Sequence, residues 1–134
     1  MHDTLELASS ARQTHILIVE DNADAAEALA MLLRMNGHDV RIAPDGASAL
    51  RLTREWTPGA ALIDIGLPDM HGLELVRKLR QNEDTKKAAI VAISGYGRPV
   101  DIETSLKAGC DYHLVKPVDY EALNAILARE RGDK

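Results

Sequence analysis

Short apolar runs alternate along the chain with longer segments in which apolar residues recur every three or four positions. The short runs predict five strands, at residues 15–20, 39–43, 60–64, 88–94 and 111–115. The longer segments predict five helices, at residues 23–36, 46–55, 72–82, 100–108 and 120–131. Continuous apolar strands joined by helices are typical of a parallel sheet covered on both faces.

The order of these elements limits how the chain can be connected. Right-handed crossovers between parallel strands restrict it to an α/β fold with a doubly wound sheet. The length of 134 residues and the lack of an internal linker indicate one domain, at residues 15–131, between polar tails at 1–14 and 132–134. In such a sheet, binding sites lie beyond the carboxyl ends of the strands.

The helix at 23–36 has two different apolar faces. The face expected to pack on the sheet is formed by Ala25, Leu29, Leu32 and Leu33. The face expected to meet solvent is formed by Ala26, Ala30 and Met31. An outward face this apolar is unusual, and we interpret it as a surface for a partner.

Composition and charge exclude several classes of function. The formal net charge is −5 with no basic run, which argues against direct binding to nucleic acid. Cys110 is the single cysteine, so we expect a small buried side chain and neither a disulfide framework nor a cysteine zinc site. The sequence contains no membrane-length apolar run and no signal-like segment, so the expected location is cytoplasmic, without membrane contact.

Charged and hydroxyl side chains stand at the carboxyl ends of the predicted strands. They are Glu20, Asp21, Asp64, Ser94 and Lys116. Three carboxylates at one sheet edge repel one another unless a cation shares the site. Mg²⁺ suits a site with few protein oxygens and several waters, and Mn²⁺ is a second candidate. Each acid alone could equally be a solvated strand end or a helix cap, so the prediction of a metal site depends on the whole set.

The residues around these positions resemble the receiver domain of two-component response regulators. The matching motifs are Ile18-Val19-Glu20-Asp21-Asn22, Asp64 with Leu67-Pro68 and Gly72, Ala92-Ile93-Ser94-Gly95, and Val115-Lys116-Pro117. Residues 109–119 are especially similar to receivers fused to hybrid histidine kinases. The resemblance implies a flavodoxin-like five-stranded sheet in the order 2-1-3-4-5, with five helices.

The resemblance also implies roles for the acidic residues. Asp64 would be the phosphoacceptor, taking a phosphoryl group from a phosphohistidine. Asp21, Asp64 and the backbone carbonyl of Gly66 would bind Mg²⁺ directly, and Glu20 would act through an ordered water. Such a chain is a phosphoacceptor that phosphorylates and dephosphorylates itself, and not a turnover enzyme acting on an external substrate.

Lys116 and Ser94 would contact phosphoryl oxygens, and Pro117 would follow a cis peptide bond. Ser94 stands where many receivers carry threonine, and it keeps the hydroxyl. When the phosphoryl group draws Ser94 inward, the loop that begins with Gly95 and Tyr96 would move. The identities of Gly66 and Tyr96 should set the lifetime of the phosphoryl group.

His113 departs from the family pattern. Many receivers carry a tyrosine or phenylalanine three positions before the lysine, and that ring turns inward on phosphorylation. A histidine at this position could rotate in the same way, could make the output sensitive to pH, or could be a packing residue. The sequence leaves these three interpretations open.

The expected partners follow from the resemblance. A histidine kinase or a histidine phosphotransfer domain would dock on the outward face of the helix at 23–36. The switched output surface would comprise residues 100–108, 111–115 and 120–131, with an unknown partner, and a weak homodimer stays open.

Two other classes of function remain. A pseudo-receiver would bind partners without phosphotransfer, although the complete set of acids, hydroxyl and lysine argues against it. An enzyme of related fold is disfavoured, because no phosphate-cradling loop follows the first strand and Gly66 replaces the acid that phosphatase chemistry needs. We expect no output domain after residue 131, so a stand-alone regulator or phosphate relay and the receiver of a longer protein are both open.

Overall fold

The computed structural model describes residues 14–130, so the predicted tails lie outside the described residues except for Thr14. The strands are β1 (His15–Val19), β2 (Asp39–Ala43), β3 (Ala60–Asp64), β4 (Ala89–Ser94) and β5 (Tyr112–Val115). The helices are α2 (Ala23–Met35), α3 (Gly46–Leu52), α4 (Gly72–Gln81), α5 (Pro99–Ala108) and α6 (Tyr120–Glu130). None of these helices is both long enough and apolar enough to cross a bilayer.

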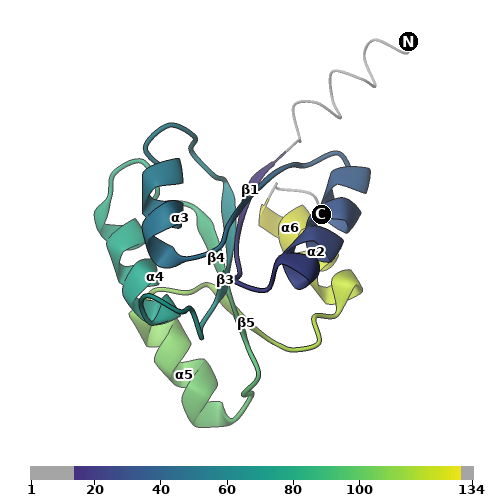
Figure 1. The fold of residues 1–134 in the computed structure, drawn as a ribbon. Coiled ribbons are helices and arrows are strands. Elements are labelled where there is room, and N and C mark those ends of the chain that lie inside the picture. Colours follow the sequence, from purple (N-terminus) through teal and green to yellow (C-terminus); the bar gives the residue numbers. More distant parts are fainter. Residues whose placement is uncertain (1–13, 131–134) are drawn as a thin grey trace, which may run out of the picture.

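The five strands form one parallel sheet in the order β2-β1-β3-β4-β5, which confirms the predicted fold class and strand order. Strand β2 lies at an edge, in agreement with its alternating sequence. Helices α2 and α6 cover one face of the sheet, and α3, α4 and α5 cover the other (Figure 1). The carboxyl ends of all the strands therefore point to the same edge of the molecule.

The core has one layer on each face of the sheet. Along β1, Leu17 and Val19 belong to the cluster beneath α3 and α4, whereas Ile16 and Ile18 belong to the cluster beneath α2 and α6. All four side chains are at most 2% exposed. Burying such a side chain stabilises the fold by roughly 1.5–3 kcal/mol, so β1 contributes substantially to both layers of the core.

The predicted faces of α2 are only partly right: Leu33 is buried and Leu29 packs against the core as expected, but the alanines and Leu32 are misplaced. Ala26 and Ala30, expected at the surface, are buried at 1% and 0% exposure, and Leu33 is buried with them. Ala25, expected inside, is exposed, and Leu32 is 41% exposed. The inner stripe contains two alanines, which let the helix lie close to the sheet, and Leu32 then falls at its flank. The outward position of Met31 agrees with the prediction, at 62% exposure.

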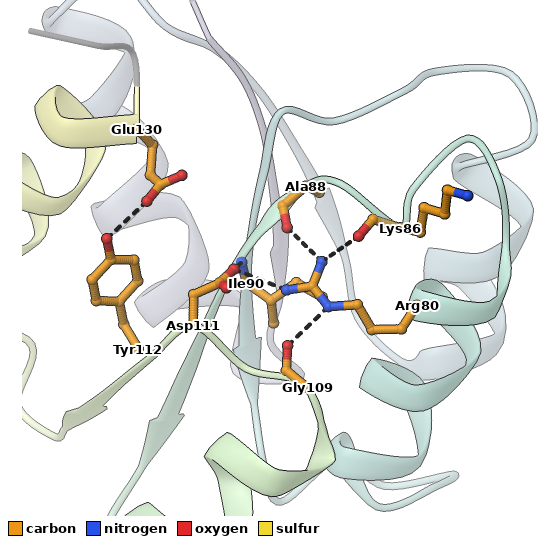
Figure 2. Close-up of polar contacts among 8 residues, drawn as sticks. All are labelled: Arg80, Lys86, Ala88, Ile90, Gly109, Asp111, Tyr112 and Glu130. Atoms are coloured by element: carbon orange, nitrogen blue, oxygen red, sulfur yellow. Dashed lines mark hydrogen bonds and ion pairs between the residues drawn. The ribbon is translucent and has the colours of Figure 1, made fainter.

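The end of the sheet opposite Asp64 is held by a guanidinium. Figure 2 shows Arg80 of α4 at the centre of backbone and side-chain acceptors from separate segments. Its nitrogens donate to the carbonyls of Lys86, Ala88 and Gly109 and to the Asp111 carboxylate, at 2.7–2.8 Å. This fork fixes the places where β4 and β5 begin, at the end of the sheet away from the carboxyl ends of the strands.

Candidate functional site

Strands β1, β3 and β5 bring four charged side chains together at their carboxyl ends. Asp64 is the last residue of β3 and is 8% exposed. The Lys116 ammonium, just beyond β5, donates to Asp64 Oδ2 at 3.0 Å and lies 3.4 Å from Glu20 Oε1. The sequence-predicted lysine and acids therefore occupy one site, although up to 96 positions separate them along the chain.

Glu20, Asp21 and Asp64 form an acidic cluster in which one carboxylate oxygen of each residue lies within 4.8 Å of the others. Asp64 is buried, Glu20 is half-buried and Asp21 is exposed, so the cluster opens to solvent on one side. Hard oxygen donors with an open side suit Mg²⁺, which keeps several of its waters. The residues present therefore fit the expected metal.

The charges of this cluster act on one another. Partial burial, and then the neighbouring Asp64 carboxylate, raise the pKa of Glu20, against the opposing effects of the Asn22 N–H and Lys116. Partial burial works to lower the pKa of Lys116, but the Asp64 and Glu20 carboxylates outweigh it and raise that pKa above its usual value. The lysine therefore stays charged and offsets part of the negative charge of the site.

The loop after β3 holds the Asp64 side chain from the other side. The Gly66 N–H donates to Asp64 Oδ1 at 2.9 Å. At Gly72, a Cβ would lie only 2.6 Å from both the Asp64 carbonyl oxygen and Ile65 Cα. A larger residue at the start of α4 would push this loop off the end of β3, which explains the glycine of the Asp64 motif in physical terms.

The carboxylate of Asp69 links the same loop to the start of α3. Asp69 Oδ1 accepts a hydrogen bond from the Gly46 N–H at 2.9 Å, and Oδ2 accepts one from the Ala47 N–H at 3.0 Å. Met70 packs beside it so closely that a Cβ at Gly46 would lie 2.6 Å from Met70 Cγ. The loop that carries Gly66 is therefore tied to a neighbouring helix.

Ser94 lies at the end of β4, is 6% exposed, and lines a cavity of about 360 Å³ together with Asp64. Its Oγ accepts a hydrogen bond from the Tyr96 N–H at 2.9 Å. This contact leaves the hydroxyl hydrogen of Ser94 able to donate. Gly95, between them, is exposed, and so is Tyr96.

His113 lines the same cavity and bridges two elements. Its Nε2 lies 2.9 Å from the Tyr96 carbonyl oxygen, and its Nδ1 lies 2.8 Å from Ser105 Oγ. Because a carbonyl only accepts, Nε2 must carry the hydrogen of that contact. The ring is therefore held at both nitrogens.

A groove of about 600 Å³ runs from the acidic cluster along α2. Its apolar lining includes Ala25, Leu29 and Leu32 of α2, together with Pro117 and Val118, and the Lys116–Pro117 peptide bond is cis. The apolar surface of α2 near the site is thus formed by residues that the sequence placed inside.

Sequence reasoning missed Ser105 and Asp69. Ser105 is 1% exposed and sits on the buried side of α5, three positions before the buried Ala108. A serine at an inward helical position needs a hydrogen-bond partner, and that requirement could have drawn attention to it. Asp69 follows Pro68 in an exposed loop, where an aspartate is too common to be informative.

Comparisons with known proteins agree on one family. Residues 16–128 match the response regulator receiver domain. The chain is 38% identical over 121 residues to the two-component response regulator PhoP of Pseudomonas aeruginosa, covering 87% of this chain and 53% of that protein. It is 36% identical over 115 residues to the transcriptional regulatory protein CseB of Streptomyces coelicolor, covering 86% of this chain and 48% of that protein. The chain thus spans about half the length of these relatives.

A solved structure extends the comparison. The receiver domain of the sensor histidine kinase PA1611 from Pseudomonas aeruginosa superposes with a TM-score of 0.81 and 31% identity, over 90% of this chain and 99% of that one. That structure has a magnesium ion coordinated in its active-site cleft. On these matches and on its own fold, this chain belongs to the response regulator receiver domains of two-component signalling.

Proposed function

We propose that this domain, spanning residues 15–131, takes a phosphoryl group from a phosphohistidine donor onto Asp64. The observation that carries the proposal is the placement of Asp64, with the Lys116 ammonium at 3.0 Å and two further carboxylates within 4.8 Å. A carboxylate in these surroundings has a cation on one side and a place for a second cation on the other. It can therefore accept a group that brings more negative charge.

The transfer exchanges one phosphorus bond for another. A carboxylate oxygen of Asp64 attacks the phosphorus, the phosphorus–nitrogen bond to the donor imidazole breaks, and its electron pair stays on the imidazole nitrogen. The product is an acyl phosphate on Asp64. Hydrolysis later returns the free carboxylate and inorganic phosphate.

Asp21, Asp64 and the Gly66 carbonyl would hold Mg²⁺, with Glu20 acting through a bound water. Mg²⁺ held there supplies positive charge that offsets the charge of the transferring phosphoryl group. The fit of the oxygen donors supports this assignment, since three carboxylates from two strand ends converge within 4.8 Å. Mn²⁺ would fit the same donors.

Lys116 and Ser94 would bind separate phosphoryl oxygens. Lys116 already donates to Asp64 at 3.0 Å, and Ser94 has a hydroxyl hydrogen available because its oxygen accepts from Tyr96. Gly66 and Tyr96 line the same cavity as Asp64 and Ser94, and their identities would set the lifetime of the acyl phosphate.

A histidine kinase or histidine phosphotransfer domain would dock on the groove beside α2, because this groove leads to Asp64 and is largely apolar. The output surface would comprise α5, β5 and α6. Val100 and Leu106 of α5 are 56% and 46% exposed there, which suits contact with a partner protein or a second copy.

The decisive experiment compares the intact mass of the wild-type chain and Asp64→Asn after incubation with acetyl phosphate and MgCl₂. We expect the wild type to gain the mass of one phosphoryl group and the variant to gain none, since an amide oxygen is a poor nucleophile. Omitting Mg²⁺, or adding a chelator, should suppress the gain.

Wild type that stays unlabelled with acetyl phosphate and with protein donors would overturn the proposal and favour a pseudo-receiver that binds partners without phosphotransfer. Labelling of Asp64→Asn to the wild-type extent would overturn the assignment of Asp64. Circular dichroism of the variant separates loss of chemistry from loss of fold.

A further inference from the structure

His113 is the one residue at a receiver motif position whose role the family pattern leaves open here, and its contacts are specific. The ring reaches the Tyr96 carbonyl at 2.9 Å with Nε2 and the Ser105 hydroxyl at 2.8 Å with Nδ1. Ser105 is 1% exposed, and its hydroxyl also lies 3.0 Å from the Ile102 carbonyl within α5. The imidazole therefore ties the loop at 95–98 to the body of α5.

The same loop residue holds Ser94. Tyr96 donates its N–H to Ser94 Oγ at 2.9 Å and offers its carbonyl to His113. A continuous path of hydrogen bonds thus runs from the Ser94 hydroxyl through the Tyr96 backbone to His113 and on to Ser105. Movement of Ser94 toward a phosphoryl group would have to break this path or carry Tyr96 along.

We infer that His113 is a latch that holds the loop at 95–98 in the position in which Tyr96 donates to Ser94, and so restrains Ser94, in place of a ring that rotates freely on activation. The inference rests on the proposed function of Asp64 and Ser94. It makes His113 a positioning residue, because its two hydrogen bonds go to Tyr96 and Ser105 and it acts on Ser94 through Tyr96.

The contacts hold for either charge state of the ring. In the neutral ring, Nε2–H donates to Tyr96 and Nδ1 accepts from the Ser105 hydroxyl. In the imidazolium, both nitrogens donate, and Ser105 turns its hydrogen to the Ile102 carbonyl at 3.0 Å. The latch to Tyr96 therefore does not need a charged ring, and the geometry favours a mechanical restraint over a pH switch.

The test uses His113→Phe, which keeps a planar ring and removes both hydrogen bonds. Freed of the latch, Ser94 should reach the phosphoryl group more readily, and labelling by acetyl phosphate should be roughly threefold to tenfold faster than in wild type. Hydrogen exchange at the Tyr96 amide should also accelerate. His113→Gln, whose side chain keeps an N–H donor, should lie closer to wild type in both measurements.

A double-mutant cycle shows whether His113 acts through Ser94. In the Ser94→Ala background no hydroxyl pulls on the loop, so His113→Phe should leave the labelling rate unchanged. Equal rates for wild type and His113→Phe, or the same acceleration with and without Ser94, would overturn the latch. Wild type that cannot be labelled at all would instead overturn the proposed function. If His113→Phe fails to fold, Ser105→Ala provides the second variant, with a smaller acceleration expected.

Discussion

Asp69 lies outside the acidic cluster but holds the loop that follows Asp64. Its two carboxylate oxygens accept the backbone N–H groups of Gly46 and Ala47, which are among the unpaired donors at the start of α3. Those two hydrogen bonds, the Gly46 contact first, lower the pKa of the Asp69 carboxyl. The ionised carboxylate therefore both pairs with two N–H groups in the first turn of α3 and fixes the loop that carries Gly66.

The lowered pKa of Asp69 gives a prediction with a definite sign. The charged form is favoured by the fold, so its stabilising effect is complete above the ordinary pKa of an aspartate and is lost as the pH falls through the lowered value. Asp69→Asn should therefore reduce Tm by roughly a few degrees at pH 7. The difference from wild type should shrink toward zero in acid, as thermal denaturation over a pH series will show.

Asp84→Asn is the matched control, because the Asp84 carboxylate lies exposed in another loop and has no hydrogen bond in the described part of the chain. We expect its Tm to follow that of wild type at every pH. A Tm difference for Asp69→Asn that persists unchanged at the lowest pH would show that the charge of Asp69 is not what holds the loop.

The acids and the lysine of the site could be found from the sequence because each stands where a strand of characteristic pattern ends. Asp64 and Lys116 needed only the rule that parallel strands end at one edge. Ser105 could not be found in this way, because its partner His113 lies on a different element and their contact depends on how α5 packs. Contacts of this kind are set by tertiary structure, about which the local pattern says nothing.

Helix α2 shows the same limit of sequence-based prediction for a whole element. Its start at Ala23 agrees with the prediction and its end at Met35 lies one residue earlier, and Asn22 caps it by accepting from the Ala25 N–H at 3.0 Å with Oδ1. Leu33 is buried as predicted, whereas Ala25 and Leu32 are exposed, because a helical apolar pattern does not show whether alanines or leucines face the sheet. Close packing on the sheet selected Ala26 and Ala30, and it left Leu32 beside the groove.

Donor docking is best tested at the exposed residues of α2 that line the groove, and not at its buried alanines. Ala25→Glu and Ala28→Glu would place carboxylates in the groove without disturbing the core, since both residues are exposed and line it. We expect phosphotransfer from a histidine kinase or histidine phosphotransfer domain to slow at least tenfold, as the loss of about 1.4 kcal/mol of docking energy implies. Labelling by acetyl phosphate, which needs no docked protein, should be unchanged.

Met31→Glu serves as the control for docking, because Met31 is exposed on the same helix and does not line the groove. Its transfer rate should equal that of wild type. A double variant of Ala25 and Ala28 that accepts phosphoryl groups from a protein donor at the wild-type rate would place the docking surface elsewhere.

Across the whole molecule, the two ends of the sheet differ in their polar contacts. At one end, Arg80 links α4, the start of β4 and the start of β5 through uncharged carbonyls and one carboxylate (Figure 2). At the other end, three carboxylates repel one another around a single lysine. The second end is therefore where a bound cation should most increase the stability of the entire domain.

Binding of Mg²⁺ to the folded state alone stabilises it by RT ln(1 + [Mg²⁺]/Kd), which is about 1.4 kcal/mol at ten times Kd. We expect urea denaturation of the wild type to show a gain of this size in MgCl₂ relative to NaCl of equal ionic strength, a comparison that removes simple screening. Asp21→Asn should lose most of the gain, because the exposed Asp21 can be replaced without affecting the core while one metal ligand disappears. The same gain in Asp21→Asn, or no gain beyond NaCl in wild type, would mean that the carboxylates of Glu20, Asp21 and Asp64 do not hold the ion. Because unfolding is followed without any phosphodonor, this result tests the metal site independently of phosphotransfer.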